Sequence, residues 1–551
     1  MNLIHGLHFN NLKDDIYGGL TAAVVALPLA MAMGVASGVG PIAGIYGAIF
    51  VGFFASIFGG TPAQVSGPTG PMTVVMAVIF TQYTGMFPDD PGHGAALAFT
   101  VVMMSGLIQI IFGFLKLGKY IELVPHPVVS GFMSGIGVII ILLQLGPFVG
   151  QAIESKPLEA VKLIPEYFSN IESHALILGV IVLAIVYGMP KFLPRLNKLL
   201  PSPLLALIVG TLVYLLFMKA GDTPTIGNIP TGFPEIITPT IDASLIIQMI
   251  ISATTLASLG AIDSLLTSLV ADNKTHTQHR SSRELIGQGI GNTVAGIFGG
   301  LPGAGATMRT VVNINAGGRT PISGALHALV LLAIVLGAGS LASDIPKAVL
   351  AAILIKVGTD IIDWDYLKRL NKVPKAGIII MLTVFIITVV IDLLLAVGVG
   401  MIMASFLFMH RMTQLQIDSM DSISNSETIQ KLSDEEGQII DSANGKIMIF
   451  KMSGPLSFSS AKAMSRYHAK LGNYDIILLD LSEVTLIDFT TSLALENIIL
   501  DTQNASKKVY LVGANESVYA TLEKQGITEH LASEYIFKDR LTCLQNAQSL
   551  L

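Results

Sequence analysis

One acidic residue stands inside a long apolar run, in the segment "LGAIDSLLTSLVAD" at 259–272. A charged side chain costs on the order of 3 kcal/mol at the centre of a membrane helix, so Asp263 is a candidate functional group. Thr267 lies one helical turn further along, on the same face. Carboxylate and hydroxyl oxygens suit a small hard cation, and the carboxylate could instead take up a proton. Simple structural pairing of Asp263 with Arg309 is the third alternative.

A second group of candidates follows a glycine-rich break that the chain contains twice. The letters "IFGG" occur at 57–60, before "TPAQVSGPTGP", and again at 297–300, before "LPGAGATMRT". Glycine and proline would interrupt a helix at these places, and the half-helix after each break would direct its N-terminal amides into the gap. Such helix ends bind anions. The alternative is a pair of tight glycine turns in a helix bundle. The candidate anion-binding residues at these two helix starts are Thr69, Gly70 and Arg309.

The second break also offers oxygen ligands that could complete a cation site around Asp263. The backbone carbonyl of Gly305 and the hydroxyl of Thr307 would join the Thr267 hydroxyl and the Asp263 carboxylate as ligands of a small hard cation. Arg309 is a permanent cation close to this site. It could hold the substrate, or it could neutralise Asp263 when no sodium is bound.

The elements that must position these residues are membrane helices. The 551 residues are 52% hydrophobic and 13% charged, with a mean hydropathy of +0.68, which is too apolar for a soluble multidomain protein. Apolar runs predict fourteen spans. They lie near 16–36, 42–59, 67–83, 95–117, 127–149, 173–189, 203–218, 244–270, 285–299, 305–315, 321–341, 345–362, 376–391 and 392–410.

The number of spans and the loop charges together predict the orientation. An even number returns both termini to one side, and most loop lysines and arginines fall on that side, so we expect both termini in the cytoplasm. The two "IFGG" stretches occupy equivalent places in two halves of seven spans each. Because seven is odd, the halves have opposite orientations. Inverted repeats are typical of secondary transporters, whose binding site lies near the midplane of the membrane.

The C-terminal part of the chain has a different character. We expect the transport domain at 1–413, a polar linker at 414–444, and a small α/β domain at 445–551, in which apolar strand patterns alternate with helical ones. The single cysteine, Cys543, lies in this last domain and cannot form an intramolecular disulfide.

Several classes of function are disfavoured by the sequence. It contains no P-loop, no metalloenzyme spacing and no Ser-His-Asp arrangement in a plausible context, and no basic stripe suggests nucleic acid. We therefore expect a transporter and not an enzyme, surrounded by membrane lipid and driven by an ion gradient or by the gradient of its own substrate. No cofactor is expected beyond sodium as a coupling ion.

Four motifs together resemble the sulfate permease family, also called solute carrier family 26. They are "DIYGGLTAAVVALPLAMAMGVASG", "GPTGPMTVVM", "RELIGQGIGNTVAGIFGGLPGAGATMRTVVNINAGGRTP" and "DLSEVTLIDFTTSLALE". Within the family, "GFMSGIG", "TSLVAD" and "VGTDIIDW" resemble the BicA-type branch of sodium-coupled bicarbonate transporters. The resemblance implies a polytopic helical protein in which a core of spans 1–4 and 8–11 moves against a gate of spans 5–7 and 12–14, in a homodimer with an elevator-like motion.

The resemblance also implies roles for particular residues. It assigns Asp263, Thr267, Gly305 and Thr307 to a sodium site, and Thr69, Ala306 and Thr307 to the anion pocket. Arg309 is a departure, since the bicarbonate branch has glycine at that place. A fixed cation could favour sulfate, chloride or a dicarboxylate.

The C-terminal domain resembles the STAS fold of anti-sigma-factor antagonists. In those proteins a phosphorylated serine or threonine follows an aspartate after the central strand, and the nearest equivalent is Thr490 in "IDFTTS". The usual "SSG" is absent, so dimer contact and regulation are the expected roles of this domain.

These observations lead to one principal hypothesis and two alternatives. We expect a sodium-coupled bicarbonate symporter of the bacterial inner membrane. The first alternative is proton-coupled or exchange transport of sulfate, chloride or a dicarboxylate. The second is an anion channel or a signalling protein built around the STAS domain.

Overall fold

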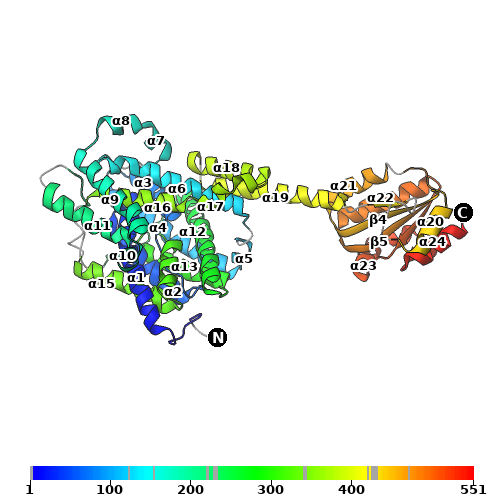
Figure 1. The fold of residues 1–551 in the computed structure, drawn as a ribbon, viewed down its shortest axis with the longest axis horizontal. Coiled ribbons are helices and arrows are strands. Elements are labelled where there is room, and N and C mark those ends of the chain that lie inside the picture. The colour runs from blue at the N-terminus through cyan, green and yellow to red at the C-terminus, as the bar shows by residue number, and fades with distance from the viewer. Residues whose placement is uncertain are drawn as a thin grey trace. The chain divides into compact units, whose positions relative to one another are not determined.

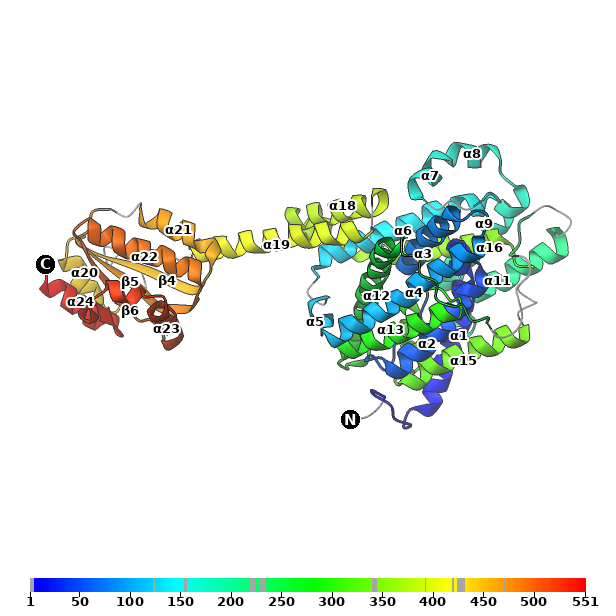
Figure 2. The same ribbon diagram turned by 180° about the vertical axis from the view of Figure 1, so that it is seen from behind.

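The chain forms two compact units, Met1–Met401 and Ile402–Leu551 (Figures 1 and 2). The computed structural model describes residues 4–121, 124–152, 156–218, 223–226, 234–338, 344–391, 393–418, 421–423, 432–469 and 472–551. The division between the units falls inside helix α19 (Leu393–Asp418).

Within the described residues, fourteen helices occupy the places of the fourteen expected spans, as two repeats of seven. The first repeat contains α1 (Leu12–Ala36), α2 (Pro41–Phe58), α3 (Gly70–Met86), α4 (Pro91–Phe114), α6 (His126–Phe148), α9 (Ser173–Phe192) and α11 (Ser202–Val213), which continues as a π-turn (Tyr214–Met218). The second contains α12 (Ile246–Thr275), α13 (Ser281–Ile297), α14 (Thr307–Asn315), α15 (Pro321–Ala338), α16 (Lys347–Ile361), α18 (Lys375–Val390) and α19. Short helices connect them: α5 (Gly118–Ile121), α7 (Pro157–Lys162), α8 (Ile164–Ser169), α10 (Pro194–Leu199) and α17 (Trp364–Lys368).

Some of these helices are long and apolar enough to cross a bilayer, and others are shorter. Among the described residues, seven helices are long and apolar enough to cross a bilayer. The half-helices α3 and α14 are shorter, because each starts at a glycine-rich break and not at a membrane surface. Proline at the first positions of α2, α3 and α4 suits these starts, since a proline there gives up no intrahelical hydrogen bond.

The helices pack as a core and a gate. In the core, α1 to α4 pack with α12 to α15, and in the gate α6 and α9 pack with α16, while α18 packs on α6. The contact of α4 with α13 depends on two facing glycines. A Cβ on Gly106 would lie 2.4 Å from the Gly289 carbonyl oxygen, and one on Gly289 would lie 2.5 Å from the Gly106 carbonyl oxygen. Small residues allow membrane helices to approach this closely.

The second unit is an α/β domain with one mixed sheet. Its strands are β3 (Asp421–Ile423), β4 (Ile447–Leu456), β5 (Ile476–Ile487), β6 (Lys508–Val512) and β7 (Ile536–Phe537), in the order β3-β4-β5-β6-β7. The pairing is parallel from β4 to β7, and β3 is antiparallel to β4. The register aligns Leu479 with Phe450 on one side and with Leu511 on the other.

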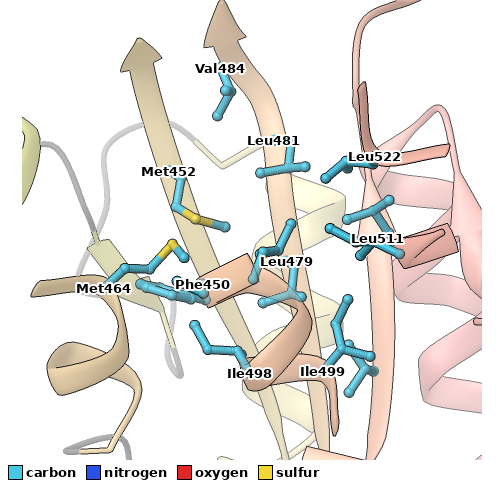
Figure 3. Packing of buried hydrophobic residues seen from close by; sticks show 14 of the residues in the cluster. Phe450, Met452, Met464, Leu479, Leu481, Val484, Ile498, Ile499, Leu511 and Leu522 are labelled. Carbon is cyan, nitrogen blue, oxygen red and sulfur yellow. The ribbon is translucent and has the colours of Figure 1, made fainter. Parts of the chain in front are cut away.

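Helices cover both faces of this sheet. On one face, α21 (Phe458–His468), α22 (Phe489–Asn504) and α23 (Glu516–Lys524) enclose a core that includes Phe450, Leu479 and Ile498 (Figure 3). On the other face, α20 (Asp434–Ser442) and α24 (Arg540–Ser549) pack over Ile449, Leu478 and Tyr510. Burying both faces explains the continuous apolar character of β4 and β5.

The expected linker at 414–444 contains structure of its own. Helix α20 belongs to this range, and its Ile439 and Ile440 are buried against the sheet. Residues 419–420 and 424–431 of the linker lie outside the described residues. The domain therefore begins earlier in the chain than its first central strand indicates.

Candidate functional site

The two glycine-rich breaks meet in the structure. Ser66 and Gly67 form the short strand β1, and Ala304 and Gly305 form β2. The two strands pair antiparallel, with Ser66 opposite Gly305 and Gly67 opposite Ala304. This pairing places the first turn of α3 and the first turn of α14 at the same point of the core. Neither helix has a side-chain cap at its N-terminus, so their first amides are available to another acceptor.

A cavity of about 80 Å³ lies between these two helix ends. Its lining includes six of the residues that the sequence predicts for the site: Thr69, Gly70, Asp263, Ala306, Thr307 and Arg309. Apolar side chains complete the wall, among them Leu29 and Met33 of α1 and Val357 of α16. The cavity thus combines an apolar surface with a few convergent polar groups, as small-ligand sites do.

Asp263 is held inside the core by α12 and is only 7% exposed. Among the described residues, neither its Oδ2 atom nor the Oγ1 atom of Thr69 makes a hydrogen bond of normal geometry, although the Thr69 hydroxyl lies near enough to the carboxylate to interact with it. Buried polar atoms without a partner are rare in native proteins. An ion or a polar ligand in the cavity would provide the missing partner.

Thr267 and Gly305 lie beside the cavity and join α12 to the second break. The Thr267 hydroxyl donates to the Gly305 carbonyl oxygen at 2.8 Å, and it lies 2.6 Å from the Thr307 hydroxyl. One turn earlier, the Ser264 hydroxyl accepts a hydrogen bond of 3.0 Å from the Gly305 amide. The oxygen atoms of Thr267, Gly305 and Thr307 thus form one group, and Asp263 lines the same cavity as Thr307. Ion binding itself stays a prediction.

Arg309 crosses from the second repeat to the first. Its side chain is 1% exposed, and Nη2 donates to the Pro68 carbonyl oxygen at 3.1 Å. Nη1 has no hydrogen-bond partner among the described residues. The ion pairs found within those residues do not include Arg309 with Asp263, so the pairing alternative finds no support. A cationic group with unused donors therefore lines the same cavity as a carboxylate.

A polar stripe on α13, which lies outside the predicted site, supports the first break. Glu284 Oε2 accepts hydrogen bonds from the amides of Gly60 (2.8 Å) and Thr61 (2.9 Å). Its Oε1 accepts from the side-chain amides of Gln64 and Gln288, both at 2.7 Å. The carboxylate thus satisfies backbone groups that a broken helix leaves unpaired.

The second break is supported by the same stripe. Asn292 accepts from the Gly303 amide at 2.7 Å and donates to the Gly303 carbonyl oxygen at 2.9 Å. Glu284, Gln288 and Asn292 follow one another at intervals of four residues, so they share one face of α13. Three polar residues at this spacing, which begin at the edge of the predicted span 285–299 and continue into it, are the sequence signal that could have revealed them.

Larger cavities lie on either side of the site, and α1 lines all of them. One of about 350 Å³ includes Val35 near the end of α1, and one of about 750 Å³ includes Tyr17 near its start. Leu29, Met308 and Val357 line both the central cavity and the larger one. The central cavity therefore adjoins the larger cavity at the N-terminal end of α1, with these three side chains at their common boundary.

Comparison with known proteins agrees with this architecture. Residues 12–384 match the sulfate permease family, and residues 438–540 match the STAS domain. The chain belongs to the sulfate permease family. Membership identifies it as a multi-pass membrane transporter of anions and not as an enzyme.

Two named relatives align with nearly the whole chain. It is 45% identical over 550 residues to the bicarbonate transporter BicA of Picosynechococcus sp., covering 99% of this chain and 96% of the relative. It is 30% identical to the putative sulfate transporter YvdB of Bacillus subtilis, covering 97% of each.

Two solved structures of the family are similar to this one. The transmembrane domain of a cyanobacterial BicA matches 72% of this chain and all of its own, with a TM-score of 0.67 and 49% identity. The murine solute carrier 26 member A9, an anion transporter in an inward-facing state, matches 98% of this chain and 92% of its own, with a TM-score of 0.83. At 19% identity, the second likeness concerns the fold alone.

The remaining predicted residue, Thr490, lies in the STAS domain and not in the transport site. It is exposed in the first turn of α22, whose N-terminus Asp488 caps by accepting a hydrogen bond of 2.8 Å from the Thr491 amide. A regulatory role for Thr490 stays a prediction.

Proposed function

We propose that this protein is a sodium-coupled bicarbonate transporter of the bacterial inner membrane. The observation that carries the proposal is the unpartnered carboxylate oxygen of Asp263, buried in one cavity with the N-termini of α3 and α14. The 45% identity to a protein described as a bicarbonate transporter supports the choice of anion.

The anion would bind between the two helix ends. Each end carries about half a positive charge, so two ends that face one cavity favour a small anion without needing many charged side chains. The Thr69 hydroxyl, which makes no hydrogen bond of normal geometry among the described residues, could donate to an oxyanion. Arg309 would contribute its Nη1 group from the same wall.

Sodium would be the co-transported substrate, next to the anion. The oxygen atoms of Asp263, Thr267, Gly305 and Thr307 are of the type that hard cations prefer, and the free Asp263 oxygen fits this assignment. Without a cation, the Asp263 carboxylate repels an anion in the same cavity. A bound sodium ion removes that repulsion, so each substrate should raise the affinity for the other.

Transport would require movement of the core, which carries the site, relative to the gate. Helices α3 and α14 belong to the core, whereas α16 of the gate provides Val357 as the opposing wall. In the proposed cycle, the core carries both ions past this wall in an elevator-like motion within a homodimer. Both termini would lie in the cytoplasm, so the larger cavity near Tyr17 would open to that side.

The decisive experiment is uptake of radiolabelled bicarbonate by purified protein in proteoliposomes. We expect an inward sodium gradient to drive accumulation, and a potassium gradient of the same size to fail. Uptake that is equal with the two gradients would reject sodium coupling. Large passive anion currents in electrical recordings would favour a channel.

A second candidate substrate is sulfate, because Arg309 adds a full positive charge to the cavity. Competition by sulfate, chloride and dicarboxylates at fixed bicarbonate concentration would rank these anions. In this alternative Asp263 would carry a proton and not sodium. The variant Asp263→Asn should then lose the dependence of uptake on pH, and an unchanged dependence would count against proton coupling.

A further inference from the structure

The cavity on the side of the α1 N-terminus contains an ion pair that the proposed site does not use. It measures about 750 Å³, and among its described lining residues the charged ones are Lys356 and Asp360 of α16. The Lys356 ammonium contacts both carboxylate oxygens of Asp360. The two side chains are 22% and 29% exposed, so the pair is partly solvated and faces the cavity.

Aromatic and hydroxyl groups hold the pair in place. The Lys356 ammonium lies 5.3 Å from the ring centre of Tyr187 on α9, which is within the range of a cation–π contact. The Tyr187 hydroxyl lies 2.7 Å from the Thr359 hydroxyl, which donates to the Lys356 carbonyl oxygen at 2.7 Å. The lysine is therefore positioned from two helices of the gate and does not extend freely into solvent.

The position of the pair places it next to the anion path. Val357, adjacent to Lys356 in the chain, lines both the central cavity and the larger one, as do Leu29 and Met308. An anion that leaves the central cavity past these residues meets Lys356 as the first cationic side chain of the larger cavity. A lone ammonium there would bind it, whereas a paired one is largely neutralised.

We propose that Lys356 is a transient binding site for small oxyanions between the central cavity and the adjoining cavity, and that Asp360 keeps its affinity low. The carboxylate competes with the passing anion for the same ammonium group. Weak binding lets the anion leave, and transport requires that exit. The inference rests on anion transport, which family membership shows, and not on the identity of the anion.

Neutralising each partner should therefore have opposite effects. Asp360→Asn exposes the full charge of Lys356 and should raise anion affinity about tenfold, the effect of one charge-assisted hydrogen bond. Lys356→Gln removes the site. The double variant Lys356→Gln/Asp360→Asn should behave as Lys356→Gln alone, because Asp360 acts only through the ammonium.

The single tryptophan provides a direct reporter of binding. Trp364 donates through Nε1 to the Thr359 carbonyl oxygen at 2.7 Å, so its indole is hydrogen-bonded to the same turn of α16 as the pair. The full chain in detergent is titrated with bicarbonate, and separately with sulfate, at constant ionic strength, while tryptophan fluorescence is followed. We expect a saturable change in Asp360→Asn at about tenfold lower anion concentration than in the unmodified protein. The gain should be absent in the double variant.

Transport provides the second measurement. Proteoliposomes are preloaded with increasing concentrations of the transported anion, and initial uptake is recorded. Uptake by Asp360→Asn should be inhibited at internal anion concentrations about tenfold lower than those that inhibit the unmodified protein. Uptake by the double variant should not show this increase in sensitivity. Asp365→Asn is the matched control, since Asp365 is exposed on α17 and lies outside the cavity.

Two outcomes would overturn the inference. One is an Asp360→Asn protein that titrates like the unmodified protein, and the other is a gain that persists in the double variant. If bicarbonate is not transported but sulfate is, the proposed substrate fails. The fluorescence titration with sulfate then still decides the role of Lys356.

Discussion

At the scale of single residues, the site contains two charged side chains, Asp263 and Arg309, that form no ion pair with each other among the described residues. Asp263 and Arg309 line one cavity, yet each keeps an atom without a partner among the described residues. Leaving a buried charged group unpaired is costly, and such sites persist where a ligand completes them. The two unpartnered atoms belong to groups of opposite charge, which fits the proposed binding of a cation and an anion in one cavity.

Asp263→Asn tests the cation part. The amide keeps the shape of the side chain but removes its charge, so sodium-driven bicarbonate uptake should fall by about tenfold or more. The measurement is the initial rate in proteoliposomes as a function of sodium concentration. Asp272→Asn, nine residues further along α12 and outside the cavity, is the control and should retain sodium dependence. A normal sodium dependence in Asp263→Asn would remove the basis for the proposed coupling.

Arg309→Gln tests the anion part. Loss of the fixed charge should weaken inhibition by the divalent sulfate about tenfold, and affect the monovalent bicarbonate less, because attraction scales with the charge of the anion. The inhibition constants of both anions are the quantities to compare. Equal weakening for both would assign Arg309 to general anion binding and not to selectivity.

At the scale of elements, α13 is the support on which the two breaks are built. The Glu284 carboxylate accepts hydrogen bonds from two backbone amides and two side-chain amides around the first break. Hydrogen bonds to a charged group are stronger than those between neutral groups. A buried donor that loses its acceptor also costs the full desolvation free energy of that donor.

Glu284→Gln should therefore destabilise the protein by about 2 kcal/mol. The introduced NH₂ group cannot accept from Gly60 and Thr61, so part of the cluster must rearrange. Thermal unfolding of the full chain in detergent would show the loss as a lower midpoint. Glu166→Gln, on the exposed surface of α8, is the matched control and should unfold like the unmodified protein.

The crossing of α1 with α2 provides a packing test. A Cβ on Gly44 would lie 1.8 Å from the Ala30 carbonyl oxygen, which is too close for any real contact. Gly44→Ala should force the helices apart and cost about 3 kcal/mol, visible as a lower unfolding midpoint. Gly337→Ala has open space around its Cβ and should be neutral or slightly stabilising, because alanine favours helix more than glycine does.

At the scale of the whole molecule, the STAS domain forms a unit with its own two-sided core. An ion-pair cluster ties its last helix to its first. Arg540 donates to both carboxylate oxygens of Glu436, at 2.8 and 3.0 Å, and to Asp480 at 2.9 Å. Burial alone would raise the pKa of Glu436, but the hydrogen bonds from Arg540 and Ser433 outweigh it and hold the pKa below its usual value of 4.5.

This depressed pKa predicts the direction of a pH effect. The folded domain binds fewer protons at Glu436 than the unfolded chain, so the stabilisation is present above about pH 4.5 and is lost as the pH falls through the folded pKa. In urea unfolding of residues 421–551, Glu436→Gln should lose less stability between neutral pH and about pH 4 than the unmodified segment does. Parallel losses in both would show that other groups control the acid sensitivity.

Much of the fold could be predicted from the sequence alone, because the bilayer imposes simple rules. Apolar runs locate fourteen helices, since unsatisfied backbone groups are excluded from lipid. The twin "IFGG" stretches indicate two inverted repeats, and isolated polar residues such as Asp263 mark the site. In the second unit, apolar strand patterns predict β4, β5 and β6. These are local properties, and they can be recognised along the chain.

Only the tertiary structure decided what these residues contact. The antiparallel pairing of Ser66 with Gly305 joins segments about 240 positions apart, and no local pattern specifies that register. The same holds for the partners of Glu284, because its place on α13 does not show that the amides of Gly60 and Thr61 reach it. It also holds for Arg309, whose guanidinium binds the Pro68 carbonyl, while the Asp263 Oδ2 atom has no hydrogen-bond partner among the described residues. Hydrophobicity and helix breaks are properties of short segments, whereas hydrogen-bond partners depend on which segments the folded core brings into contact.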